Sequence, residues 1–238
     1  MNTFELTGRT RTHIEQLEAP RVALHRDAVA PFMALRAAAA DEGIDIIPYS
    51  AFRDFAAQVE IWNRKFRGER PLYDRGGNVR DHASLCESEI VDAILVWSAV
   101  PGASRHHWGS EIDVYDAAAM PEGYRVKLLP EEYARGGVFE KLADWLEDNL
   151  ARHGFFRPYD SDRGGVYPEP WHISYQPVST AALEALTPEV IAQALSDTEV
   201  LGKELVLDRL PEIWHTYVVN VSSPTRLASK DTGPDSKV

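Results

Sequence analysis

The chain has 238 residues, of which 44% are hydrophobic and 26% are charged, an ordinary composition for a globular protein. Its net charge is -12, from 25 basic and 37 acidic residues. Such a surface repels phosphate backbones and anionic lipid heads, so we expect neither nucleic acid nor a membrane as a partner. The single cysteine, Cys86, excludes an intramolecular disulfide and a four-cysteine zinc site. We expect its thiol to be buried as a small hydrophobic group.

The first residues lack the apolar segment of a secretory signal peptide. No stretch reaches the roughly 20 apolar residues that a membrane span requires. We therefore expect a cytoplasmic protein, although an exported protein that has lost its leader would look the same. The sequence leaves the oligomeric state open.

Apolar residues recur at helical spacing in several segments and are interrupted by short β-branched runs. Helices are expected at residues 20–43, 54–66, 88–99, 130–153 and from 187 on, and strands at 44–49, 110–115, 155–156 and 171–175. The polar, glycine-containing stretch 67–81 is expected to be a long surface loop. Helices and strands do not alternate regularly, which predicts an α+β fold with a small antiparallel sheet flanked by helices.

Two short segments carry residues suited to metal-dependent hydrolysis: residues 104–113, SRHHWGSEID, and residues 169–172, EPWH. A catalytic zinc ion uses three His, Asp or Glu ligands and leaves one position for water. A nearby carboxylate is then needed to move the proton of that water. We assign His106, Asp113 and His172 as ligands of one zinc ion and Glu169 as the general base. His107 is expected to point away from His106 if the chain is extended there.

These spacings alone are not specific, because a protein with eight histidines contains some His/Asp/Glu groups by chance. The order of the motifs adds the missing information. It resembles the D-alanyl-D-alanine metallocarboxypeptidases of the vancomycin-resistance type, which share a fold with certain cell-wall endopeptidases and with the Hedgehog signalling domain. The family pattern is Ser-x-His, Gly, Asp and a distant Glu-x-Trp-His, and here it is matched by Ser104, His106, Gly109, Asp113, Glu169, Trp171 and His172.

An upstream segment, residues 50–53 followed by Gln58, is similar to the family's Ser-x-Tyr-Arg and its later Gln, with Phe52 in the place of Tyr. The resemblance implies that Arg53 and Gln58 bind substrate beside the metal and that Ser104 contacts the peptide. A guanidinium can hold a carbonyl or carboxylate in a fixed geometry. Alternatively, Arg53 pairs only with a neighbouring acid, Ser104 caps a turn, and Gln58 is surface.

Glu111 departs from the family, which usually has Ala two residues before the aspartate ligand. Residues two apart in a strand share a face, so Glu111 should point to the same side as Asp113. One interpretation makes Glu111 an outer hydrogen-bond acceptor for a ligand imidazole. The other, which we adopt as the hypothesis, makes it a substrate contact that anchors a free amino group.

The sequence thus predicts a zinc carboxypeptidase acting on short peptides, with D-Ala-terminated, peptidoglycan-type peptides implied by the resemblance. A zinc endopeptidase of the cell wall and a non-catalytic zinc-containing binding module are the alternatives. The expected organisation is an N-terminal extension (1–19), the metallopeptidase domain (20–176), a C-terminal helical appendage (177–221) and a disordered tail (222–238).

Overall fold

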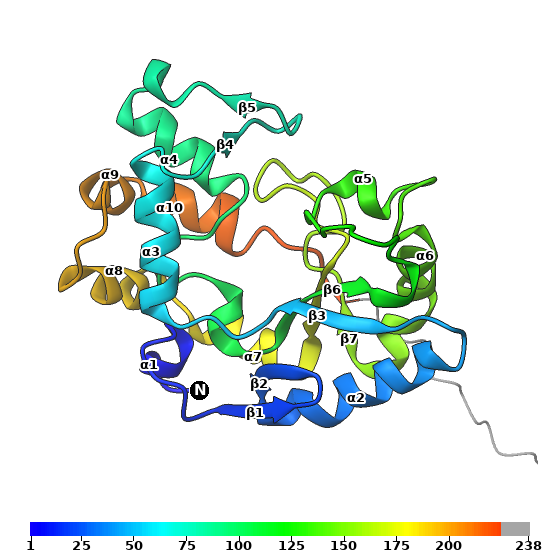
Figure 1. The fold of residues 1–238 in the computed structure, drawn as a ribbon. Coiled ribbons are helices and arrows are strands. Elements are labelled where there is room, and N and C mark those ends of the chain that lie inside the picture. Colours follow the sequence, from blue (N-terminus) through cyan, green and yellow to red (C-terminus); the bar gives the residue numbers. More distant parts are fainter. Residues whose placement is uncertain (225–238) are drawn as a thin grey trace, which may run out of the picture.

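The structure is a computed structural model that describes residues 1–224 (Figure 1). Its helices are α1 (Thr3–Leu6), α2 (Arg26–Ala40), α3 (Phe55–Phe66), α4 (Glu87–Leu95), α5 (Pro130–Tyr133), α6 (Glu140–Asn149), α7 (Gln176–Ala185), α8 (Pro188–Ser196), α9 (Lys203–Asp208) and α10 (Leu210–Ile213). Its strands are β1 (Ile14–Glu18), β2 (Arg21–His25), β3 (Ile46–Ser50), β4 (Leu72–Tyr73), β5 (Val79–Arg80), β6 (Glu111–Asp116), β7 (Phe155–Phe156) and β8 (His172–Tyr175). A 3-10 turn, Arg105–Trp108, precedes β6.

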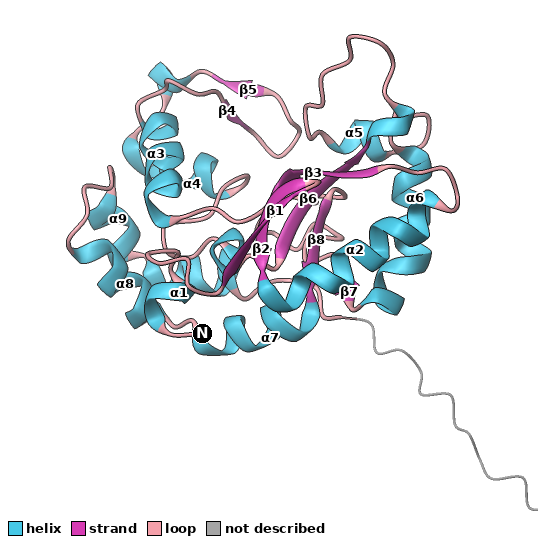
Figure 2. Cartoon of the chain, turned by 60° about the horizontal axis from the view of Figure 1, so that its bottom comes forward, coloured by secondary structure: helices cyan, strands magenta, loops and turns pink. Residues whose placement is uncertain are grey.

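A four-stranded antiparallel sheet, in the order β3-β6-β8-β7, forms the centre of the fold. Helices α2 and α6 lie along this sheet (Figure 2). The sheet and these two helices share one apolar core, to which Phe32, Leu35, Ile112, Leu146 and Ile173 contribute. The expected α+β class with a small antiparallel sheet flanked by helices is confirmed.

A second apolar core lies on the other side of the molecule, around α3 and α4. It joins Trp62 of α3 and Ile94 of α4 to Ile191 of α8, Val206 of α9 and Ile213 of α10. The C-terminal helices therefore pack on the elements that precede β6. The segment that runs from the 3-10 turn into β6 lies between the two cores.

The first strands correct the expectation that a helix begins at Pro20. Residues 14–18 and 21–25 form the antiparallel hairpin β1–β2, and α2 begins only at Arg26. The imidazole of His25 accepts a hydrogen bond from the Asp27 amide (3.2 Å), which caps the helix at that point. The stretch 67–81 also contains a minimal hairpin, β4–β5. Cys86 was expected to be buried, but it is exposed at the N-terminus of α4.

The proposed division into extension, domain, appendage and tail stays a prediction. Its boundaries separate segments that pack against or pair with one another. Leu6 is buried in the second core, and β1 pairs with β2 across residue 20. At the other end, the Ser222 amide donates to the Pro158 carbonyl (2.9 Å), so the start of the predicted tail is fixed. Residues 225–238 lie outside the described part. Within residues 1–224, none of the helices has the length and apolar character needed to cross a bilayer.

Candidate active site

The pairing of β6 with β8 brings two of the predicted ligands together. Asp113 and His172 are direct partners in the antiparallel register of these strands. Side chains of directly opposed residues project from the same face of a sheet and lie in contact distance. One oxygen of Asp113, Oδ1, accordingly lies 3.2 Å from Nδ1 of His172.

His106 reaches the same place from the 3-10 turn before β6. The turn ends at Gly109, which has a φ of 68°, a left-handed conformation that favours glycine. A β-carbon at Gly109 would lie 2.6 Å from the backbone nitrogen of His25, so a side chain there would collide with β2. The close approach of β2 therefore requires a glycine at the bend that turns His106 toward Asp113. Its Nε2 lies 3.4 Å from Oδ2 of Asp113.

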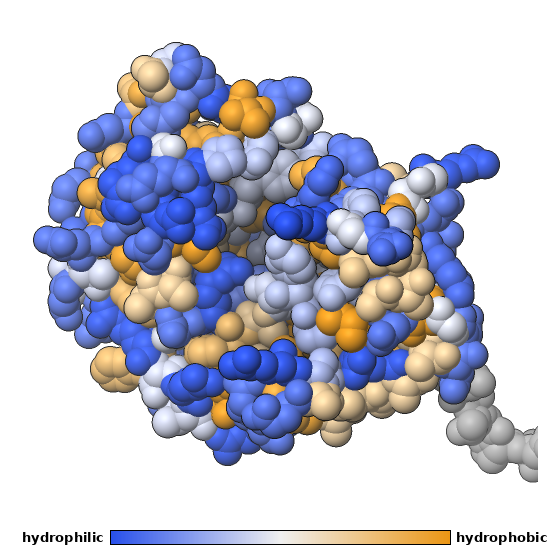
Figure 3. Space-filling view, in the orientation of Figure 1, coloured by the Kyte–Doolittle hydropathy of each residue, from blue (hydrophilic) through white to orange (hydrophobic). Residues whose placement is uncertain are grey.

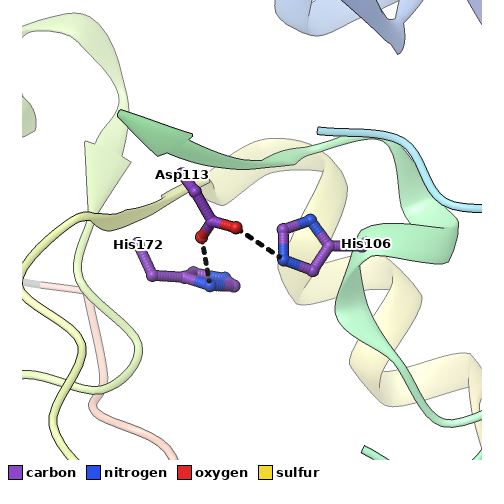
Figure 4. A group of neighbouring side chains, drawn as sticks. All are labelled: His106, Asp113 and His172. Carbon is purple, nitrogen blue, oxygen red and sulfur yellow. Dashed lines mark ion pairs between the residues drawn. The ribbon is translucent and has the colours of Figure 1, made fainter. Parts of the chain in front are cut away.

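The three predicted ligands form one compact group (Figure 4). Their ligand atoms all lie within 4.8 Å of one another, and all three residues are buried. Nδ1 of His106 lies 2.8 Å from the Ala51 carbonyl and therefore donates to it, which leaves the lone pair of Nε2 facing Asp113. Nδ1 of His172 and Oδ1 of Asp113 are buried and make no hydrogen bond within residues 1–224. Buried polar atoms left without partners and facing one another are suited to binding a divalent cation.

The charges around the group also favour a cation. Burial lowers the pKa of His106 to about 3, so its imidazole is neutral and can act as a ligand at neutral pH. Burial by itself would lower the pKa of His172, but the carboxylates of Asp113, Glu111 and Glu169 raise it well above its ordinary value. The position thus attracts positive charge, as a proton or as a metal ion.

Glu169 lies at the rim of the same group. Its Oε2 is 3.1 Å from Nδ1 of His172. The Glu169 amide donates to the Tyr159 carbonyl, and the His172 amide donates to the Glu169 carbonyl, which forms the bend that aims both side chains inward. Burial raises the pKa of Glu169, so the carboxylate is a stronger base than one in water.

Arg53 is held by a small hydrogen-bond network beside the group. Its guanidinium donates to Oε1 of Gln58 (2.9 Å) and to Oγ of Ser50 (3.2 Å). Gln58 in turn donates to the Ala99 carbonyl (2.7 Å) and is fully buried. Gln58 therefore orients Arg53 and does not face the cavity in this structure, in contrast to the substrate contact that the sequence predicts for it.

A cavity of about 230 Å³ opens onto these residues. Figure 3 shows the surface hollowed between the α3–α4 side and the α5 side of the molecule. The predicted site residues that line it are Arg53, Ser104, His106, Asp113, Glu169 and His172. The remaining walls include Trp97, Ser98, Leu128, Tyr159 and Val166, whose positions the sequence analysis did not single out. In a sequence, isolated side chains in loops and after helix ends have no spacing that separates a cavity residue from a core or surface residue.

Glu111 does not line the cavity, which contradicts the expectation of a substrate contact. Its carboxylate is fully buried behind the ring of His172. One oxygen accepts from Nε2 of His172 (2.9 Å), and the other accepts from Arg105 (3.2 Å) and Ser174 (2.8 Å). Although burial alone would raise its pKa, Arg105 and His172 lower the pKa of Glu111 to about 2. The geometry favours the other interpretation, an ionised outer acceptor that leaves the lone pair of His172 on Nδ1.

His107 and Lys65 lie next to the residues of the candidate site. His107 lies in the 3-10 turn, not in an extended strand, and its Nδ1 donates to the Arg53 carbonyl (2.7 Å), so it stabilises the backbone beside the site. Lys65 of α3 donates to Oγ of the cavity residue Ser98 (2.6 Å). Burial lowers the pKa of Lys65 to about 8, and Glu169 is the carboxylate that opposes this shift.

Known proteins resemble this chain in sequence and in fold. The sequence profile of VanY, D-alanyl-D-alanine carboxypeptidase, matches residues 21–178. An uncharacterized protein of Haemophilus influenzae is 37% identical over 122 residues, which span 50% of this chain and 93% of that protein. A D-alanyl-D-alanine carboxypeptidase of Enterococcus faecalis is 29% identical over 170 residues, 70% of this chain and 51% of that protein.

Two solved structures share the fold at a TM-score of 0.50. VanYB in complex with D-Alanine-D-Alanine is 22% identical, and the match covers 78% of this chain and 89% of that one. A variant of the vancomycin-resistance D,D-pentapeptidase VanY in complex with Zn(II) is 23% identical, with 77% and 89% covered. The match to the family profile covers more than half of the sequence and includes the whole cluster. This chain therefore belongs to the VanY family of D-alanyl-D-alanine carboxypeptidases.

Proposed function

We propose that this protein is a zinc-dependent carboxypeptidase that hydrolyses the C-terminal peptide bond of short peptides, with D-Ala-terminated, peptidoglycan-type peptides as its substrate class. The observation that carries the proposal is the convergence of His106, Asp113 and His172 on one point, with Glu169 beside them and a cavity in front. The solved relatives with bound Zn(II) and with D-Alanine-D-Alanine support the choice of metal and of substrate.

His106, Asp113 and His172 would hold one zinc ion through Nε2, the carboxylate and Nδ1, the atoms that face one another. When bound, zinc lowers the pKa of a water molecule and polarises a carbonyl group. The fit rests on the donor set, two imidazole nitrogens and one carboxylate, and on the unpartnered atoms of Asp113 and His172 within residues 1–224.

Glu169 would act as the general base and then as the general acid. It accepts a proton from the attacking water, whose oxygen adds to the scissile carbonyl carbon. When the C–N bond breaks, Glu169 returns that proton to the leaving nitrogen, so the carboxylate is regenerated. Its raised pKa suits both roles, because the group must gain and lose a proton in one cycle.

Arg53 would bind the substrate on its C-terminal side and stabilise the negative charge that develops on the carbonyl oxygen. Its orientation by Gln58 and Ser50 fixes the guanidinium before substrate arrives. Lys65, through Ser98, adds positive charge on the same side of the cavity. The free carboxylate of a peptide fits these cations, and Ser104 would contact the peptide backbone from the cavity wall.

A peptide panel tests the proposed function. We expect the purified protein with zinc to release the C-terminal residue from D-Ala-D-Ala and from a D-Ala-terminated stem peptide, and to lose this activity in the presence of a chelator. An L,L-dipeptide and a C-terminally amidated version of the stem peptide should be cleaved more slowly, because the first misplaces the side chains and the second lacks the carboxylate. Cleavage of the amidated peptide at an equal rate would favour the endopeptidase alternative.

The outer position of Glu111 yields a separate prediction. The negative charge of Glu111 balances Arg105 and fixes the tautomer of His172. Replacing Glu111 by glutamine removes this charge, so zinc affinity should fall roughly 10- to 100-fold. Competition with a chromophoric chelator measures this affinity. Glu132→Gln, which changes a buried carboxylate that does not touch the cluster, serves as the control and should keep the zinc affinity.

The amine-anchor hypothesis for Glu111 predicts a different result. Under that hypothesis, Glu111→Gln would impair cleavage of a free dipeptide and spare its N-acylated form, with zinc affinity unchanged. An equal loss on both peptides, together with weaker zinc binding, would exclude the anchor and support the outer acceptor.

A further inference from the structure

Leu128, in the loop that precedes α5, has an unusual backbone conformation. Its φ is 54°, and within residues 1–224 it is the only residue other than glycine with a positive φ. A bulky side chain such as that of leucine is disfavoured in this left-handed region, which glycine or asparagine adopts more readily. The fold must therefore hold Leu128 in place through its neighbours.

The carboxylate of Glu132 provides that restraint. It accepts hydrogen bonds from the amides of Lys127 (3.1 Å) and Leu129 (2.9 Å) and from the hydroxyl of Tyr124 (2.6 Å). Two amides that flank a residue in the left-handed conformation and point at one anion form a nest, a backbone concavity suited to negative charge. Glu132 is itself buried, so the loop is wrapped around a fixed internal anion.

The nest explains the backbone of Leu128 but not the choice of leucine. A nest needs only main-chain amides, and glycine at this position would form it with less strain. What leucine adds is a side chain, and Leu128 lines the cavity in front of Asp113, Glu169 and His172. Its neighbour Leu129 is exposed and is not part of the cavity.

The position of Leu128 within the cavity indicates which part of a substrate it meets. Among the residues that line the cavity, Arg53 precedes α3 and Ser98 and Ala99 follow α4, whereas Leu128 precedes α5. Figure 1 shows α3 and α4 on one side of the molecule and α5 on the other. Given the proposed function, the carboxylate of the peptide lies toward Arg53. The residue on the other side of the scissile bond, the penultimate residue, then lies toward Leu128.

We propose that Leu128 is a specificity-determining residue, held by the Glu132 nest as the wall that limits the size of the penultimate side chain. This inference deepens the proposed function and rests on it for the direction in which the peptide lies. The wall favours a small side chain, such as that of alanine, and excludes bulky ones by contact. One extra methylene group in a substrate side chain changes kcat/KM by roughly 10- to 200-fold in a closely fitting pocket.

The test uses N-acylated dipeptides that end in D-Ala and carry D-Ala, D-Leu or D-Phe in the penultimate position. In wild type, kcat/KM should be highest for D-Ala and lowest for D-Phe. Leu128→Ala and Leu128→Gly should raise the ratio of kcat/KM for D-Phe over D-Ala at least about 10-fold. Glu132→Gln should shift the ratio in the same direction, because it loosens the nest while keeping the leucine.

Two controls separate selectivity from general damage. Leu129→Ala changes the exposed neighbour, and Val126→Ala changes a residue that packs on the core without lining the cavity, so neither should alter the ratio. Thermal unfolding of each variant checks that it is folded. A ratio that stays constant in the Leu128 variants would overturn the proposal.

The same peptides should also be titrated into Glu169→Gln protein, with and without Leu128→Ala, to obtain Kd values that do not depend on turnover. A shifted order of Kd values, combined with no hydrolysis of these peptides by the wild-type protein, would contradict the proposed function alone. If the wild type hydrolyses the peptides but Leu128→Ala leaves the order of the Kd values unchanged, only the proposed role of Leu128 is contradicted.

Discussion

Replacing Glu169 by glutamine should lower kcat on a D-Ala-terminated peptide by about 100- to 10,000-fold while bound zinc is retained. Glutamine has nearly the shape of glutamate but cannot accept the proton of the attacking water. Oε2 of Glu169 lies 3.1 Å from Nδ1 of His172, but Glu169 is not one of the three proposed ligands, so the change leaves the ligand set intact. Steady-state kinetics and the zinc content of the same preparation measure the two quantities.

Glu131→Gln is the matched control for this change. Glu131 is exposed and does not line the cavity, so its loss of charge should leave kcat unaltered. If Glu169→Gln loses its zinc together with its activity, Glu169 acts as a ligand and not as a base. If it keeps the wild-type rate, another group moves the proton and the proposed mechanism is wrong.

Replacing Asp113 by asparagine should abolish stoichiometric zinc binding. Asp113 is the only carboxylate among the three proposed ligands, and it lies between the two imidazoles, 3.4 Å from His106 and 3.2 Å from His172. The neutral amide removes the charge that offsets that of the ion. The loss of affinity should exceed the roughly 10- to 100-fold expected for an outer-shell change such as Glu111→Gln, and hydrolysis should fall with it.

Asp116→Asn serves as the control on the same strand. Asp116 is buried at the end of β6, where its carboxylate accepts from the amides of Asp45 and Ala118, and it lies outside the cavity. That variant should therefore bind zinc as wild type does. Retention of one zinc per chain at wild-type affinity by Asp113→Asn would contradict the proposed coordination. Metal content after dialysis and competition with a chelator provide the readout.

Part of the fold could be predicted because its signals are local. Residues 54–66 combine a capping aspartate with apolar residues at helical spacing, and α3 begins at Phe55, with the side chain of Asp54 accepting from the Ala57 amide (2.8 Å). The β1–β2 hairpin was missed because it lies beside a stronger helical pattern. In the folded chain β2 also contacts a distant segment, through the hydrogen bond from the His25 amide to the Gly109 carbonyl.

The candidate site could likewise be predicted only in part from the sequence. The motifs identified the residues that now surround one point, because the chemistry of zinc restricts the residue types and the resemblance to the family supplies their order along the chain. Sheet periodicity placed Glu111 on the side of Asp113, and both do approach His172. It could not show that the ring of His172 lies between Glu111 and the cavity. That depends on the register in which β8 pairs with β6, with Ser174 opposite Glu111 and His172 opposite Asp113.

By itself, then, the sequence determined the family, the α+β class and the three residues, His106, Asp113 and His172, that form the compact group able to hold a metal ion. Only the tertiary structure decided which of the predicted site residues face the cavity, because burial and direction depend on packing between segments far apart in the chain. Glu111 and Gln58 became orienting groups behind His172 and Arg53. Leu128, a loop leucine with no distinguishing pattern, became a cavity wall because a buried carboxylate four residues later fixes its backbone.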